Sequence, residues 1–327
     1  MFNALVLQQQ QDIVHAQVQE LDESQLPAGD VLVQIHYSSF NYKDGMILKG
    51  LGKLVRNYPH VPGIDFAGCV EQSSNPAYQA GDKVLVTGWR VGETHWGGFA
   101  QKARVSADWC LPLPTGLDCR QAMMLGTPGL TAMLALMAME REGLAPGEGK
   151  VLITGASGNV GSLAVALLAN LGYQVEASTG KLSASAMLQT LGAKKITARL
   201  TSKPENQPAL GPKRWIAAMD TVGGPALAHI LSHLESQGMV AAIGLTGGNQ
   251  FCTSLLPFLL RGVKMLGIES ATCPIKTRKI AWERLAHEMP LQKLEAITQV
   301  HSLEELPRLA EAILAGELMG RCLIDVN

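Results

Sequence analysis

Residues 151–161 read Val151-Leu152-Ile153-Thr154-Gly155-Ala156-Ser157-Gly158-Asn159-Val160-Gly161. An apolar strand is expected to end near Thr154, a glycine turn follows, and an apolar helix is expected to continue to about Leu171. Glycines let the backbone approach a pyrophosphate, and free amides at a helix start attract its negative charge. Ala156 replaces the first glycine of G-x-G-x-x-G. The stretch predicts a dinucleotide-binding turn, although a strand–helix turn without a ligand has the same glycines.

Strands and helices alternate after this turn, whereas the pattern well before it is different. Strands are expected at Tyr173–Ala177, Trp215–Asp220, Gly238–Ile243 and Lys264–Ile268, with helices at Ala184–Leu191 and Pro225–Leu234. A βαβ succession is typical of a doubly wound parallel sheet. Before about residue 115, short alternating segments broken by turn residues indicate a β-rich, barrel-like domain. The predicted fold class is α/β, with a β-rich domain preceding a Rossmann domain.

The length of the chain indicates more than one core. We expect domains at 1–120 and 121–297 in this 327-residue chain, and residues 298–327 to return to the first domain with a helix and a final strand. The formal charge of -1 excludes a global attraction to nucleic acid or to an anionic membrane. We also expect no apolar run near membrane-spanning length, and an N-terminus that forms a strand instead of a leader. Six scattered cysteines fit a reducing cytoplasm.

The second strand of the expected Rossmann domain ends Glu176-Ala177-Ser178-Thr179-Gly180-Lys181. NAD-specific sites place an acid after this strand to bind the ribose hydroxyls, whereas this chain has small hydroxyl residues and a lysine. Ser178 and Thr179 can donate to a 2′-phosphate and Lys181 can neutralise it, with Arg199 as a second cation. Glu176 comes two or three positions early, and we interpret it as facing away from the ribose. The pattern favours NADPH, although an ordinary solvated loop has the same composition.

Six sequence boxes resemble the medium-chain dehydrogenase/reductase superfamily, in which a GroES-like catalytic domain precedes a Rossmann domain. In order, they are Asn41-Tyr42-Lys43-Asp44, Val61–Gly68, Gly81–Val84, Gly97–Ala100, Gly126–Ala132 and the glycine turn. The zinc branch of that superfamily needs a Cys near position 40 and a His-Glu pair where this chain has Ile64-Asp65. We therefore expect no metal site. A short-chain dehydrogenase is disfavoured, because about 150 residues precede the turn and no tyrosine has Lys four positions later.

Several longer stretches look like the acrylyl-CoA reductase (NADPH) family. They are Ser38–Asp44, Gly52–Pro59, Gly88–Gly98 and Ala217–Gly223. The resemblance implies reduction of a short α,β-unsaturated acyl-CoA and, from the family alone, a homodimer. It implies nucleotide contacts at Tyr42, Ser157, Gly158, Asn159, Val160, Thr179, Gly180, Lys181, Arg199, Leu245, Leu259, Ser270 and Gly316, to which the glycine turn adds Gly161 and the end of the second strand adds Ser178. Lys181 stands where that family often has Arg, which keeps the charge and loses bidentate geometry.

Conjugate reduction without a metal requires hydrogen-bond donors at the substrate carbonyl and a proton source. Tyr42 is the expected nicotinamide contact and donor, supported by Asn41, although water can supply the proton instead. Lys53 and Arg56, in a loop with a local positive excess, and Arg90 beside two tryptophans are the expected substrate contacts for CoA. A solvated loop is the alternative for this segment. Two other functions stay open, which are an NADPH:quinone reductase and a non-catalytic NADPH-binding protein.

Overall fold

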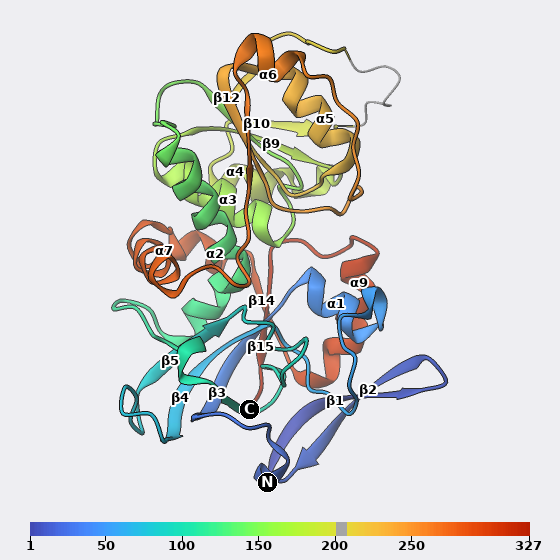
Figure 1. Cartoon of the computed structure of the whole chain (residues 1–327), viewed down its shortest axis with the longest axis vertical. Coiled ribbons are helices and arrows are strands. Elements are labelled where there is room, and N and C mark those ends of the chain that lie inside the picture. Colours follow the sequence, from blue (N-terminus) through green and yellow to red (C-terminus); the bar gives the residue numbers. More distant parts are fainter. Residues whose placement is uncertain (201–207) are drawn as a thin grey trace. The chain divides into compact units, whose positions relative to one another are not determined.

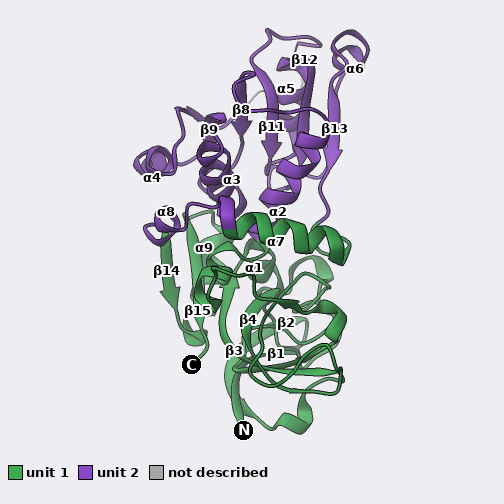
Figure 2. Cartoon of the chain, turned by 90° about the vertical axis from the view of Figure 1, so that its left-hand side faces the viewer, with its two compact units in different colours: residues 1–127, 270–286, 297–327 green, residues 128–269, 287–296 purple. Residues whose placement is uncertain are grey.

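The structure, a computed structural model, describes residues 1–200 and 208–327, which form two compact units (Figures 1 and 2). Unit 1 comprises Met1–Thr127, Ser270–Ala286 and Ile297–Asn327, and the described part of Pro128–Glu269 together with His287–Ala296 forms unit 2. Each unit has its own sheets and its own core. The domain division 1–120, 121–297 and 298–327 stays a prediction.

Unit 2 is built on a parallel sheet with the strand order β10-β9-β8-β11-β12-β13. The strands are β8 (Lys150–Ile153), β9 (Gln174–Thr179), β10 (Lys195–Ala198), β11 (Trp215–Asp220), β12 (Leu234–Ala242) and β13 (Lys264–Gly267). The helices are α3 (Asn159–Asn170), α4 (Ser185–Leu191), α5 (Gly224–His233), α6 (Leu256–Arg261) and α8 (Leu291–Glu295). Val151, Leu152 and Ile153 of the central strand β8 are fully buried, because helices cover both faces of a parallel sheet.

Unit 1 is built on a larger, mostly antiparallel sheet with the order β14-β15-β3-β4-β5-β7, and β6 pairs with β3. Its strands are β3 (Val31–Phe40), β4 (Asp65–Ser73), β5 (Lys83–Thr87), β6 (Lys102–Val105), β7 (Leu111–Pro112), β14 (Thr298–His301) and β15 (Arg321–Asp325). The first two strands, β1 (Phe2–Gln10) and β2 (Ile13–Leu21), form a separate hairpin. The helices α1 (Tyr42–Leu48) and α9 (Leu306–Leu314) complete the unit with most of α7 (Ile275–Glu288).

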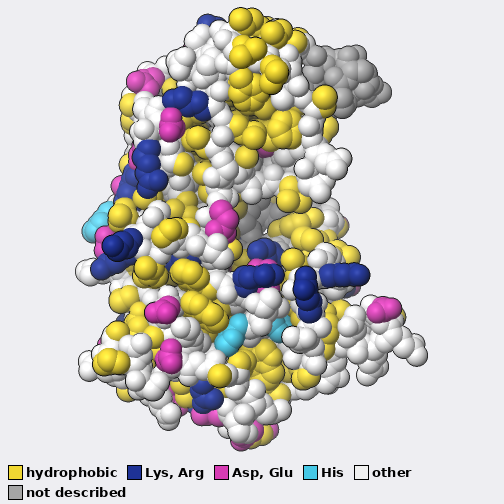
Figure 3. All heavy atoms as spheres, in the orientation of Figure 1, with side chains coloured by type: hydrophobic (Ala, Val, Ile, Leu, Met, Phe, Trp, Pro, Cys, Tyr) yellow, Lys and Arg dark blue, Asp and Glu magenta, His cyan; other side chains and the backbone are white. Residues whose placement is uncertain are grey.

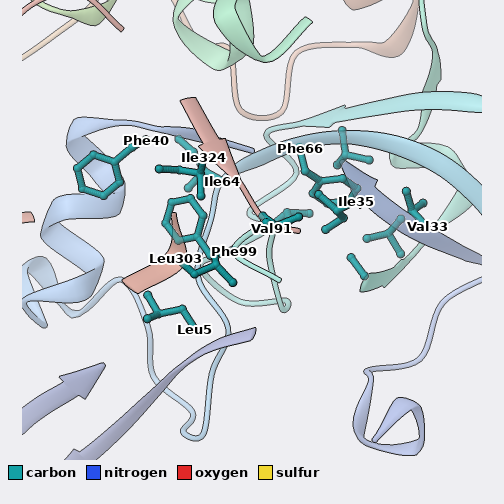
Figure 4. Close-up of a cluster of buried hydrophobic side chains, with 14 of the residues drawn as sticks. Leu5, Val33, Ile35, Phe40, Ile64, Phe66, Val91, Phe99, Leu303 and Ile324 are labelled. Carbon is teal, nitrogen blue, oxygen red and sulfur yellow. The ribbon is translucent and has the colours of Figure 1, made fainter. Parts of the chain in front are cut away.

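The core of unit 1 joins segments from both ends of the chain. Strand β15, close to the C-terminus, pairs with β3 from Cys322–Phe40 to Asp325–Tyr37. Figure 4 shows Ile324 beside Phe40 and Ile64, with Leu5 and Leu303 close to Phe99. The predicted α/β class is confirmed, since a β-rich unit and a doubly wound parallel sheet are both present.

Helix α2 (Cys119–Arg141) corrects one expectation of the sequence analysis. It has 23 residues and is long and apolar enough to cross a membrane, whereas no run near that length was expected. Arg120, Gly126 and Pro128 interrupt the apolar residues of this stretch, so no continuous apolar run in the sequence has the length of the helix. Within the searched, described residues, 89% of its most apolar window is buried, as in the core helix of a soluble protein. Gly126 has non-helical backbone angles (φ 53°, ψ -158°), so the helix is broken near its first third.

Candidate functional site

The glycine turn between β8 and α3 has the geometry expected for phosphate binding. Gly155 has a φ of +57°, which favours glycine, and its carbonyl accepts a hydrogen bond of 2.9 Å from the amide of Gly158. A Cβ on Gly161 would collide with that same carbonyl and with Ala156, so α3 packs closely on the turn. The N-cap of α3 is Gly158, which has no side chain to accept from the first amides of the helix. The start of such a helix, where backbone amides have no intrahelical acceptor, is a favourable place for an anion.

The carboxyl end of β9 is tied directly to this turn. The hydroxyl oxygens of Thr179 and Ser157 are 2.8 Å apart, and Thr179 Oγ1 also accepts from the amide of Lys181 at 3.0 Å. The amide of Ala156 donates to the carbonyl of Ser178 at 3.0 Å. The structure thus brings together the two segments that the sequence analysis assigned to the nucleotide.

Two cationic side chains flank the backbone after β9. The guanidinium of Arg199 lies over Gly180, because a Cβ on that glycine would be 2.7 Å from Nη2 of the arginine. Lys181 follows Gly180 directly and is half-buried. The hydroxyl of Ser178 donates to the carbonyl of Ala198 at 3.1 Å, so this predicted phosphate donor already has an acceptor within the protein.

Glu176 lies apart from this corner. Its carboxylate is buried, and it forms ion pairs with Lys195 at 3.4 Å and with Arg214 at 3.7 Å. It stands three residues before Thr179 on the same strand, and alternate residues of a strand point to opposite faces. The carboxylate of Glu176 contacts Lys195, which is the first residue of β10, and Arg214, which immediately precedes β11.

A buried carboxylate that the sequence analysis missed holds the carboxyl ends of β8 and β11 together. Asp220 accepts from the hydroxyl of Thr154 and from the amides of Val222 and Gly223, at 3.1 and 2.9 Å. Burial raises the pKa of Asp220, while these hydrogen bonds act in the opposite direction. The hydroxyl of Thr221 completes the network by donating to the carbonyl of Thr154 at 2.9 Å. The signal in the sequence is an acid at the end of an apolar strand, followed by Gly-Gly.

In unit 1, the residues Asn41 and Tyr42 begin helix α1. The amide of Asn41 donates to Asp44 Oδ2 at 2.9 Å, and Asp44 Oδ1 accepts from the amide of Ile64 at 3.0 Å. Burial, followed by the charge of Asp65, raises the pKa of Asp44 well above its usual range. Asn41 is buried, whereas the side chain of Tyr42 is 40% exposed. The local structure fixes the tyrosine backbone and leaves its ring accessible to a ligand.

Asp65 and Arg321 form a second buried network beside Asn41. Asp65 accepts from the amide and the hydroxyl of Ser39 at 3.1 and 2.8 Å, and from the amide of Thr127 at 2.8 Å. Arg321 donates to the carbonyl of Met124 at 2.7 Å and to Asn41 Oδ1 at 3.4 Å. Neither residue was predicted as part of the site. An arginine in the last strand gives no sequence signal, because charged residues are rarely buried.

Comparison with known proteins identifies the family. The alcohol dehydrogenase GroES-like domain matches residues 27–115. The chain is 51% identical to the acrylyl-CoA reductase AcuI of Ruegeria pomeroyi, and the match covers 100% of both proteins. The chain belongs to the acrylyl-CoA reductase family. This confirms the resemblance predicted from the sequence boxes.

Two solved structures have the same fold as this member of the acrylyl-CoA reductase family. The structure of Escherichia coli K-12 YhdH with bound NADPH has a TM-score of 0.95 and 47% identity, covering 99% of this chain and 100% of that one. The structure of Bacillus subtilis YhfP with NAD bound has a TM-score of 0.96 and 40% identity, covering 99% of both chains.

The site in this acrylyl-CoA reductase family member has few donors that suit a metal. Ser39, Asn41 and Asp65 surround the position where the zinc branch has its ligands, and the buried guanidinium of Arg321 lies beside them. Among the described residues, no group of three or more His, Cys, Asp or Glu side chains could hold a metal ion. The absence of a metal in the working enzyme stays a prediction.

The basic segment that the sequence predicts to contact the substrate runs from Lys43 to Arg56. Ion pairs occupy some of its cations and also Arg90. Lys43 and Arg90 both pair with Glu93, at 2.9 and 3.9 Å, and Lys49 pairs with Glu311 at 2.8 Å. Lys53 and Arg56 are exposed and have no ion pair within residues 1–200 and 208–327. Figure 3 shows Lys and Arg side chains gathered over α1. The free positive charge of this segment is therefore concentrated on Lys53 and Arg56.

The remaining contacts implied by the family are divided between the units. Leu245 follows β12 and Leu259 lies on α6, and these side chains of unit 2 are 63% and 73% exposed. Gly316, with a φ of +73°, and Ser270 belong to unit 1. The carbonyl of Ser270 accepts from Arg278, a buried arginine that the sequence analysis missed.

Arg278 anchors the loop that carries Trp89 and Arg90. It donates to the hydroxyl of Thr87 at 3.0 Å and to the carbonyl of Ala271 at 3.1 Å, and its guanidinium lies 4.8 Å from the centre of the Trp89 ring. Trp89 and Arg90 both have positive φ angles, 56° and 59°, which are costly for side chains of this size. Arg278 therefore holds a strained loop beside the basic segment.

Proposed function

We propose that this protein reduces the C=C bond of a short α,β-unsaturated acyl-CoA with NADPH, most simply acrylyl-CoA to propionyl-CoA. The observation that carries the proposal is full-length membership in the acrylyl-CoA reductase family. The choice of cofactor is supported by the glycine turn and by the residues at the end of β9, which are Thr179, Gly180 and Lys181 together with Arg199. When bound, NADPH supplies a hydride, which the Cβ atom of the substrate accepts.

The described residues of unit 2 fit a dinucleotide that carries an extra phosphate. The start of α3, whose first turn includes Val160 and Gly161, offers backbone amides to the pyrophosphate. Lys181 and Arg199 neutralise the 2′-phosphate, since no acid competes for it between Ser178 and Lys181. The Ser157–Thr179 hydrogen bond fixes the distance between these two parts of the site.

Tyr42 and Asn41 carry the chemistry of the substrate in this proposal. The phenol of Tyr42 donates a hydrogen bond to the thioester oxygen as negative charge develops there, or relays a proton to Cα. Asn41 is a positioning residue, because its amide bonds to Asp44 and its side chain bonds to Asp65 at 3.2 Å. Water is the alternative proton source. Asp65 interacts electrostatically with the buried guanidinium of Arg321, and a carboxylate beside a fixed positive charge is a poor metal ligand, so the proposed reaction uses no metal.

Lys53 and Arg56 bind the CoA phosphates in this proposal, with Arg90 as a weaker contributor. The first two are exposed cations without an acidic partner in the described chain, whereas Arg90 shares Glu93 with Lys43. Phosphate groups form strong charge-assisted hydrogen bonds with such side chains. A quinone has no phosphate and would gain nothing from them.

We further propose a cytoplasmic homodimer joined at the edge strand β13. An edge strand presents unpaired backbone groups, and apolar side chains on it and on α6 favour pairing with a second copy. Leu255, Leu259, Leu260 and Met265 are between 47% and 73% exposed at this edge. Figure 3 shows hydrophobic side chains gathered around α6. The six cysteines are all free, as expected in a reducing compartment.

An NADPH-consumption screen tests the function. It compares acrylyl-CoA, crotonyl-CoA and 1,4-benzoquinone at equal concentrations, and the acyl-CoA esters are expected to give the highest kcat/KM. Faster turnover of benzoquinone would select the NADPH:quinone reductase. Tight NADPH binding without consumption on any of the three would select a non-catalytic NADPH-binding protein.

A further inference from the structure

A pocket lies at the amino ends of the parallel strands in unit 2. Its volume is about 340 Å³, and its lining includes Lys150, Glu176, Lys195, Lys213, Arg214 and Glu235. Lys150 and Lys195 are the first residues of β8 and β10, and Arg214 immediately precedes β11. All strands of this sheet are parallel, so the glycine turn and Thr179 are at the opposite edge. The pocket is separate from the proposed nucleotide site.

The buried acid of this pocket has an unused acceptor. The side chain of Glu176 is 4% exposed, and its Oε1 atom has no hydrogen-bond partner in the described structure. The closest ion-pair partner of that atom is the guanidinium of Arg214, at 3.7 Å, while Lys195 is 3.4 Å from Oε2. A buried carboxylate oxygen without a donor is costly. A ligand in the pocket that carries an O–H group would satisfy it.

The rim of the pocket is positively charged. Four cations (Lys150, Lys195, Lys213 and Arg214) stand against two acids (Glu176 and Glu235), which leaves an excess of two positive charges. Lys213 donates to the hydroxyl of Ser236, and Arg214 stacks on the ring of Trp215. Lys150 has no hydrogen bond or ion pair among the residues that the structure describes, so its ammonium group is available.

We propose that this pocket binds a small phosphate that also carries an O–H donor. The phosphate oxygens accept from Lys150, Lys195 and Lys213, and the O–H group donates to Glu176 Oε1. Hydrogen phosphate satisfies this chemistry with its own P–OH group, and a phosphorylated alcohol does so with a neighbouring hydroxyl. Sulfate has the same charge at neutral pH but no proton to donate, and the carboxylate repels it.

Calorimetric titration of the full chain at pH 7 tests the site with inorganic phosphate, glycerol 3-phosphate and sodium sulfate as probes. The better of the two phosphates is expected to bind at least about tenfold more tightly than sulfate, because only sulfate leaves the acceptor unpaired. The tighter phosphate also shows whether the ligand is free phosphate or a phosphorylated alcohol. Equal affinity for sulfate, or no heat from either phosphate at about 10 mM, a concentration that gives millimolar sites measurable occupancy, overturns the proposal.

Variants locate the binding. Glu176→Gln is expected to reduce the phosphate-over-sulfate ratio to about twofold or less and to leave sulfate binding equal or tighter, since a repelling charge is removed. Lys150→Gln, at an exposed position that does not endanger folding, is expected to weaken phosphate binding by about fivefold, and Lys194→Gln should not. If Arg199→Gln loses phosphate binding and Lys150→Gln keeps it, the calorimetric signal comes from the proposed 2′-phosphate site. That result overturns the proposal.

Discussion

The hydroxyl oxygens of Ser157 and Thr179 lie 2.8 Å apart and share one hydrogen bond. This contact joins the glycine turn after β8 to the end of β9, and both residues are buried. Because one residue lies beside the proposed pyrophosphate site and the other beside the proposed 2′-phosphate site, the bond sets their spacing. Its removal should affect binding of the whole cofactor.

Thr179→Val is expected to raise the Kd for NADPH about five- to thirtyfold, since the change removes the hydroxyl that bonds both to Ser157 and to the amide of Lys181, and each bond is worth about 1 kcal/mol. Fluorescence titration of NADPH measures the effect. Thr190→Val is the matched control, because the exposed hydroxyl of Thr190 donates to the carbonyl of Ala186 within α4 and has no other bond among the residues that the structure describes. An unchanged Kd in Thr179→Val would show that the spacing is fixed by other contacts.

Arg199→Gln is expected to lower kcat/KM with NADPH by about ten- to a hundredfold and to leave the value with NADH almost unchanged, because only NADPH has the 2′-phosphate. Steady-state kinetics with both cofactors measure the change. Lys194→Gln removes an exposed cation just before β10 and should alter neither value. A parallel loss with NADH would place Arg199 outside the 2′-phosphate contact.

Tyr42→Phe is expected to lower kcat with acrylyl-CoA by about a hundredfold if the phenol donates to the developing charge or to Cα. The KM for NADPH should rise little, because the ring itself is retained. Tyr37→Phe, in strand β3, is the control. Unchanged kcat and unchanged solvent-proton incorporation in Tyr42→Phe would remove the hydroxyl from the chemistry and favour water as the proton source.

Arg321→Met is expected to lower the free energy of unfolding by about 3–5 kcal/mol, because it removes one side of a buried charge network. Asp65 would lose a nearby positive charge, and the carbonyls of Met123 and Met124 would lose their donor. Chemical denaturation measures the change. Arg308→Met, at a position 70% exposed, should alter stability by less than about 0.5 kcal/mol. If the free energy of unfolding falls equally in the two variants, the buried network of Arg321 contributes no more to stability than an exposed arginine does.

His229 provides a pH-dependent prediction. Burial, with the charges of His233 and Arg214, lowers the pKa of His229 from 6.5 to about 4. The folded chain favours the neutral ring, so this contribution to stability is complete above pH 6.5 and is lost as the pH falls through about 4.

His229→Phe should make the unfolding free energy less dependent on pH within that interval, by on the order of 1 kcal/mol after allowance for solvent screening. Denaturant titrations at pH 7.0, 5.5 and 4.5 measure the slope. His15→Phe changes an exposed histidine of the β1–β2 hairpin and should keep the original slope. If the unfolding free energy of His229→Phe depends on pH as steeply as that of the unchanged protein, His229 is not the source of this pH dependence.

Sequence reasoning succeeded where the signal is local. The glycine turn, α3 and β9 could be predicted because apolar periodicity and glycine positions act over a few neighbouring residues. Helix α7 was not predicted, although its buried residues Arg278, Ala281, Trp282 and Leu285 have the i, i+3, i+4, i+7 spacing of one helix face, because most of its other residues are charged or polar. Its buried Arg278 gave no signal either, since burial of a charge depends on acceptors supplied by distant segments.

The sequence by itself determined the alternation of strands and helices, the position of the glycine turn between β8 and α3, and the family, because each of these depends on contiguous residues. Only the tertiary structure decided that Arg321 meets Asn41 beside Asp65, that Thr179 bonds to Ser157, and that Glu176 faces a cationic pocket. Contacts of this kind depend on strand pairing between remote segments. The donors and acceptors of these contacts come from segments that are far apart in the sequence. They meet only in the folded chain, so neither composition nor local spacing predicts them.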